Sequence, residues 1–152
     1  MNVPGDIRAR VFSLLAAAAP AAAGQTAQIS MAEPPTEDGV GGSLPAIYVG
    51  GAGETNPAWA SADARQATLT IPVVLEIAGR GDSAADREAM DAFADAVVKA
   101  LANQTDLACG MGDLGVTAFG FTASDVALGY RATVARAIAL TLHCHILNDA
   151  RT

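Results

Sequence analysis

The side chains that could support catalysis or metal binding are few, and the two histidines are the first of them. His143 and His145 lie two residues apart, and in a strand this spacing puts both rings on one face, where they could supply two metal ligands. Cys144 then faces the other side, and no further histidine remains to act as a third ligand. We therefore expect two histidines near a strand end and no metal site.

A glycine-rich segment, Gly110 to Gly115, matches the pattern G-x-G-x-x-G. That pattern binds a dinucleotide when a strand precedes it and a helix N-terminus follows to meet the pyrophosphate. The flanking sequence predicts the opposite order here, with a helix before and a strand after. We therefore expect a connecting segment and no cofactor.

Three acids, Glu88, Asp91 and Asp95, recur along one predicted helix. Carboxylates on an open helix face are usually solvated, so we expect a solvated face or a subunit contact rather than acid–base catalysis. The chain has no G-x-S-x-G motif, and its single lysine, Lys99, falls late in the same helix rather than in a phosphate-binding loop. The sequence thus predicts no catalytic residue and a protein that is not an enzyme.

Two helices are predicted. The first begins at an N-cap, Asp6, and ends before Pro20 and Gly24; its apolar face holds Ile7, Val11, Leu14, Leu15 and Ala18. The same segment has the charge, apolar run and A-x-A site of a secretory signal, which stays open as an alternative. The second helix is expected from Ala84 to about Asn103, with Ser83 as its cap and an apolar face of Met90, Phe93, Ala94, Val97, Val98 and Leu101.

Five strands are predicted from alternation and turn residues. Pro45 suits a first or an edge position in a strand. Pro72 removes one backbone donor from the clearest strand, so that strand either lies at an edge or carries an interrupted ladder. The last strand is long and is expected to be central. The expected ranges are Ala27 to Met31, Leu44 to Val49, Ala67 to Ile77, Val116 to Phe121 and Tyr130 to Ile146.

These elements predict an α+β fold with a mainly antiparallel sheet of four to five strands and two helices on one face. The 152 residues suit a single domain spanning 1–152, with loops at about 32–43, 50–66 and 103–115. No run approaches the ~20 apolar residues of a membrane helix. The net charge of −7 argues against specific nucleic-acid binding, and the cysteines, Cys109 and Cys144, leave one disulfide open.

The long loops favour interaction with a partner, and the residue types point to the places. Tyr48, Trp59 and Arg65 are of kinds enriched in interfaces. One candidate patch is the expected edge strand with Ile47 and Tyr48. The other is the acidic side of the second helix, with Glu88, Asp91 and Asp95, which could meet Arg131 or Arg136.

The order of these segments resembles a known family. An Arg-containing amphipathic helix (Ile7 to Val11) is followed by a Pro/Gly-rich loop and by Leu44-Pro45-Ala46-Ile47-Tyr48-Val49. An alternating strand, a helix with Met90-Asp91-Ala92-Phe93-Ala94 and a long closing strand complete the order. This arrangement is similar to the tail terminator proteins of long-tailed bacteriophages, also called tail completion or minor tail protein U type.

The resemblance implies a small non-enzymatic virion protein, without a cofactor, that is assembled in the host cytoplasm. It implies a ring, typically a hexamer, at the head-proximal end of the tail tube. There the ring would stop tube polymerisation and meet the head connector or stopper protein, while DNA passes through the lumen without specific binding. A head-completion or connector protein of the same neck is the nearest alternative. A secreted periplasmic binding domain and a metal enzyme using His143 and His145 are more distant.

Overall fold

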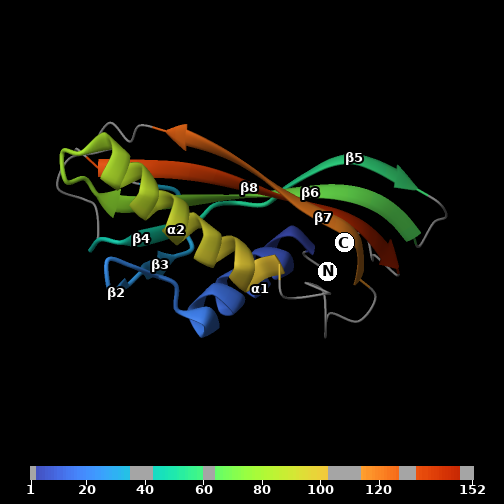
Figure 1. Ribbon diagram of the computed structural model, residues 1–152. Coiled ribbons are helices and arrows are strands. Elements are labelled where there is room, and N and C mark those ends of the chain that lie inside the picture. Colours follow the sequence, from blue (N-terminus) through green and yellow to red (C-terminus); the bar gives the residue numbers. More distant parts are fainter. Residues whose placement is uncertain (1–2, 35–42, 60–63, 103–113, 127–132, 148–152) are drawn as a thin grey trace.

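Two helices and a six-stranded sheet form the protein in the computed structural model, which describes residues 3–34, 43–59, 64–102, 114–126 and 133–147 (Figure 1). The helices are α1 (Val3–Ala18) and α2 (Ser83–Ala102). The sheet contains β3 (Gln28–Ser30), β4 (Ala46–Val49), β5 (Gly53–Trp59), β6 (Ala64–Ala78), β7 (Leu114–Val126) and β8 (Thr133–Leu147), and a separate small hairpin joins β1 (Ala21–Ala22) to β2 (Gln25–Thr26).

The strand order is β3-β4-β6-β8-β7, with β5 also paired to β6. All pairs are antiparallel except β3 with β4. The predicted α+β class with a mainly antiparallel sheet is therefore confirmed. The central position of β8 is confirmed as well, because β8 lies between β6 and β7.

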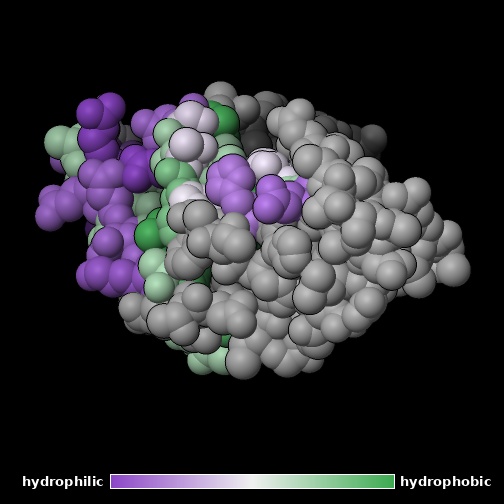
Figure 2. All heavy atoms as spheres, turned by 90° about the vertical axis from the view of Figure 1, so that its right-hand side faces the viewer, coloured by the Kyte–Doolittle hydropathy of each residue, from purple (hydrophilic) through white to green (hydrophobic). Residues whose placement is uncertain are grey.

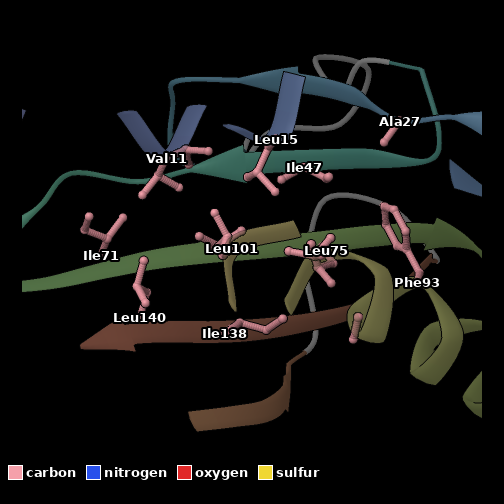
Figure 3. Close-up of a cluster of buried hydrophobic side chains, with 14 of the residues drawn as sticks. Val11, Leu15, Ala27, Ile47, Ile71, Leu75, Phe93, Leu101, Ile138 and Leu140 are labelled. Carbon is pink, nitrogen blue, oxygen red and sulfur yellow. The ribbon is translucent and has the colours of Figure 1, made fainter. Parts of the chain in front are cut away.

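One hydrophobic core joins both helices to the same face of the sheet. The helices contribute Ile7, Val11 and Leu15 from α1 and the predicted apolar face of α2, of which Val98 is only partly buried. The sheet contributes odd-numbered residues of β6 and the even-numbered residues of β8 with which they pair, and these side chains face the helices. Figure 3 shows these side chains meeting between the layers, among them Val11, Leu75, Phe93, Ile138 and Leu140. The placement of α1 in this core agrees with the amphipathic-helix alternative for the N-terminal segment.

The predicted cap of each helix was wrong. Asp6 lies inside α1, which begins at Val3, rather than capping it. At α2 the cap is Asp82 and not Ser83, because Asp82 Oδ1 accepts hydrogen bonds from the backbone N–H of Ala84 at 3.1 Å and of Ala85 at 3.3 Å. Aspartate is as good a cap as serine, and it precedes Ser83 by one position.

The segment Leu44 to Val49 was predicted to be an edge strand, and this was wrong. β4 lies between β3 and β6, because the short β3 adds to its outer side in parallel. Pro45 avoids the ladder by preceding the strand, which starts at Ala46. The peptide bond between Leu44 and Pro45 is cis.

Pro72 lies in an interior strand, so only the second of its two predicted alternatives is correct. β6 has β8 on one side and both β4 and β5 on the other. β4 pairs with Val73 to Glu76 and β5 with residues 65–70, so the two strands leave a gap opposite Pro72. The missing N–H of proline therefore falls where the edge strand is broken.

The predicted loop from 50 to 66 was wrong for most of its length, because β5 and the start of β6 occupy it. β5 carries a register shift between Thr55 and Ala58, which is where Pro57 falls. β7 is also longer than predicted and runs to Val126. Residues 35–42 and 103–113, within the other two predicted loops, lie outside the described residues.

Gly50 lies between β4 and β5, at a place with no room for a side chain. Its N–H donates to the carbonyl of Pro72 at 2.8 Å, and the N–H of Gly51 donates to Glu33 Oε1 at 3.1 Å. A Cβ atom on Gly50 would lie 2.7 Å from Pro72 Cγ and 2.8 Å from Glu33 Oε1. The proline ring is stiff, so the contact cannot be relieved by a simple side-chain rotation.

We expect Gly50→Ala to lower the free energy of unfolding by at least about 1 kcal/mol, the usual size of an overpacking effect. Gly51→Ala is the matched control, since a Cβ atom there meets nothing within 4 Å. Urea denaturation of both variants measures the difference. Equal stabilities of the two variants would contradict the crowding at Gly50.

Candidate functional site

The exposed face of α2 carries the predicted acids. Glu88, Asp91 and Asp95 are all exposed, and Figure 2 shows hydrophilic residues gathered on the side of the molecule where α2 lies. Lys99 Nζ lies 2.8 Å from Asp95 Oδ2, four residues earlier in the same helix. The hydrogen bond to Asp95, and then its negative charge, raise the pKa of Lys99.

Arg136 joins three elements through two carboxylates. Its Nη1 lies 2.7 Å from Asp91 Oδ1 on α2, and its Nε lies 2.9 Å from Asp125 Oδ1 on β7. β7 and β8 place Asp125 directly opposite Arg136 in their register. The Arg136 side chain is only 15% exposed. Burial alone would lower its pKa. The hydrogen bonds that Arg136 donates to Asp125 and Asp91, together with the negative charges of these two acids, outweigh that effect, so the pKa is raised.

Two residues of this cluster were predicted to lie at a contact between chains, but they contact each other within one chain. Asp91 and Arg136 were both interface candidates, and the structure pairs them with each other. The carboxylates of Glu88 and Asp95 remain on the open face as candidates. Arg131, the alternative partner for these acids, lies outside the described residues.

We expect Arg136→Ala to lower the free energy of unfolding by about 1 kcal/mol, because two charge-assisted hydrogen bonds are lost but both acids are more than half exposed. Lys99→Ala is the control, since it also removes a cation paired with an α2 acid, but at a fully exposed site. Urea denaturation should show the larger loss for Arg136. A larger loss for Lys99→Ala would contradict the bridging role of Arg136.

A cavity of about 310 Å³ adjoins this cluster, between the first half of α2 and the ends of β7 and β8. Charged groups of both signs line it, including Asp86, Arg87, Asp125 and Arg136. Asp86 Oδ1 is already bonded to the N–H of Arg80 at 2.9 Å, and Asp125 is bonded to Arg136. Two of the charged groups on its wall, Asp125 and Arg136, are thus engaged with each other, and Asp86 is engaged with a backbone amide.

The other predicted interface residues lie elsewhere. Ile47 is fully buried in the core, and Tyr48 is 5% exposed on the opposite face of β4. Trp59 and Arg65 are register partners on β5 and β6, at the end of the sheet that extends away from α2 in Figure 1. Their side chains lie outside the described residues. The structure therefore brings Trp59 and Arg65 together but separates them from the acids of α2.

The histidine pair gains no third ligand in the described part of the chain. His143 is exposed, and its Nδ1 lies 3.3 Å from Thr68 Oγ1. The side chains of Cys144 and His145 lie outside the described residues, as does Cys109. Among the residues that the structure describes, no group of three or more His, Cys, Asp or Glu side chains could hold a metal ion.

The glycine-rich match also has the flanking elements that the sequence predicted. α2 ends at Ala102 and β7 begins at Leu114, so a helix precedes the motif and a strand follows it. The glycines from 110 to 112 lie outside the described residues. The order is the reverse of the dinucleotide-binding one.

Sequence reasoning missed a buried polar cluster on the sheet face opposite the helices. Glu76 is fully buried, and the hydroxyls of Tyr48 and Thr133 donate to its two carboxylate oxygens. Tyr48 Oη lies 3.0 Å from Glu76 Oε1. The available signal was Glu76 itself, a single acid in a strand whose neighbours are apolar, because a buried acid needs donors close by.

No protein-family model matches the chain, and no curated protein sequence is significantly similar to it. Neither of the described helices has the length and apolar character needed to cross a membrane.

Proposed function

We propose that this chain is a structural protein of the virion of a long-tailed phage, and specifically its tail terminator. The supporting observation is that the segments carrying the resemblance form a helix, strand, strand, helix and strand around one core. These are α1, β4, β6, α2 and β8. The chain would close into a ring, most simply a hexamer, on the head-proximal end of the tail tube.

The ring would be held by heterologous contacts, in which one patch of each subunit meets a different patch of the next. Two such patches are available at separate places on the subunit. One is the exposed acidic face of α2 with Glu88 and Asp95, and the other is the end of the sheet with Trp59 and Arg65. The tail tube protein and the head connector or stopper protein would bind the two faces of the ring. The net charge of −7 suits a channel that DNA crosses without specific binding, by like-charge repulsion.

Two alternatives are separable from this proposal. A head-completion or connector protein of the same neck would also form a ring, but it would not bind the ends of tail tubes. A secreted binding domain would lose residues 1–23, and with them the core side chains Ile7, Val11 and Leu15. The position of α1 in the core favours the virion proposal over secretion.

Native mass spectrometry and negative-stain microscopy of the full chain, alone and mixed with polymerised tail tubes, test the proposal. We expect rings with six-fold end views that cap one end of the tube. A chain that stays monomeric at high concentration, and that leaves tube ends bare, would contradict it. Rings that do not bind the tube ends would favour the connector alternative. Loss of residues 1–23, detected by N-terminal sequencing of the mature protein, would favour the secreted alternative.

A further inference from the structure

The sheet has three outer edges in the described part of the chain, and two of them are poorly suited to accept another strand. β3 is only three residues long. β5 carries Pro57 and a register shift between Thr55 and Ala58. Short length, proline and bulges are the common ways in which proteins protect the edges of their sheets.

The third edge, β7, lacks these protections. From Ala118 to Val126 it pairs with β8 residue for residue, without a register shift, and this stretch contains neither proline nor a basic residue. Gly120 and the residues from Thr122 to Val126 are exposed. The one charged side chain, Asp125, is turned back to Arg136 at 2.9 Å. Arg136 also binds Asp91, so the charge of Asp125 is partly compensated within the subunit.

The register shows which backbone groups of β7 point outward. In antiparallel pairs the N–H and C=O of a residue point to the same neighbour, and successive residues alternate. Pro72 points away from β8, because its carbonyl accepts from Gly50. Its partner Ala139 therefore points to β7, where it pairs with Thr122. Thr122 thus points inward, and the N–H and C=O of Ala123 point to the open edge.

We propose that β7 pairs antiparallel with β7 of a second copy of this chain, across a two-fold axis. Such a contact is isologous, so one edge supplies both halves of it, and the other described edges of the copy are blunted. Each copy carries a net charge of −7, but the paired stretch of each edge holds a single charged side chain, Asp125, which is bonded to Arg136 of its own chain. The pairing satisfies the outward N–H and C=O groups and joins the two sheets into one.

This inference goes beyond the proposed virion role and does not depend on it. A two-fold contact doubles the number of chains in the assembly that the other contacts form. Two free chains become a dimer, and two rings become a pair of rings joined through the same face of each. The contact would also cover the edge before the chain meets its partners, and so protect it from aggregation.

The test is the copy number of the full-length Ala123→Pro variant, measured by native mass spectrometry beside the wild type. Proline removes the outward N–H and places its ring at the edge, while the inward bonds of Thr122 and Ser124 to β8 remain. Ala123→Ser keeps the N–H and is the matched control. We expect the assembly of the proline variant to contain half as many chains as the wild-type assembly, and the assembly of the serine variant to contain the same number as the wild type.

Amide hydrogen exchange on the wild-type chain tests the same contact without relying on the fold of a variant. Protection of the Ala123 and Asp125 amides should rise with protein concentration, whereas the inward amides of Thr122 and Ser124 should be protected at all concentrations. Unchanged copy number in Ala123→Pro, or fast exchange at Ala123 at every concentration, overturns the pairing. If Ala123→Pro converts a dimer into a monomer, the pairing is supported and the ring is contradicted. If wild type and Ala123→Pro are both hexamers, the ring is supported and the pairing is contradicted.

Discussion

We expect Phe93→Ala to lower the free energy of unfolding by about 3–5 kcal/mol, the range for truncating a buried aromatic side chain. Phe93 is 1% exposed and is among the largest fully buried side chains of the described residues. It lies on the buried face of α2, and Figure 3 shows it in the layer between the helix and the sheet. Its removal takes away both its transfer free energy and its packing contacts.

Urea denaturation measures this loss, with an unchanged m-value as the sign that the unfolded state is not altered. Ala92→Ser, at the adjacent exposed position of the same helix, is the control and should cost no more than about 0.5 kcal/mol through helix propensity. A loss below about 1 kcal/mol for Phe93→Ala would show that α2 does not pack on the sheet as described.

The second large effect is expected at the buried carboxylate of Glu76, where Tyr48→Phe should lower the free energy of unfolding by about 2–3 kcal/mol. The tyrosine hydroxyl donates to Glu76 Oε1 at 3.0 Å, and Glu76 is fully buried. Phenylalanine keeps the ring but removes the donor, so the carboxylate loses a hydrogen bond that water cannot replace.

A double-mutant cycle isolates this interaction. In a Glu76→Met background there is no buried carboxylate to satisfy, so Tyr48→Phe should then cost clearly less. Thermal or urea unfolding of the four proteins supplies the cycle. Equal losses in both backgrounds would mean that the hydroxyl of Tyr48 does not stabilise Glu76.

The elements with strong hydrophobic periodicity were predictable from sequence. The apolar face of α2 and the alternation of β6 and β8 each bury one continuous set of side chains, which the spacing reveals directly. β5 was missed because its sequence, with Gly53 and Pro57, has turn-like composition and no alternation. It forms because β6 extends beyond β4 and offers an edge there, and the sequence of β5 alone does not contain that information.

The candidate site was predictable only in part, since its contacts join distant segments. Arg136 was recognisable as one basic residue in the apolar set of the last strand, but its choice of Asp91 and Asp125 depends on how α2 crosses the sheet. The long β7 edge was likewise hidden, because the residues from Thr122 to Val126 are mostly exposed. An exposed strand shows no strong hydrophobic pattern.

The gap opposite Pro72 divides one side of β6 into two stretches, and the strands that pair with them, β4 and β5, should open separately. β4 pairs with Val73 to Glu76 and has β3 on its other side, whereas β5 pairs with β6 alone. Since residue 72 has no N–H, the ladder on that side does not continue through it. We expect native-state hydrogen exchange to show β5 opening at a lower free energy than β4, in a sub-global step that leaves the pairing of β4 with β6 intact.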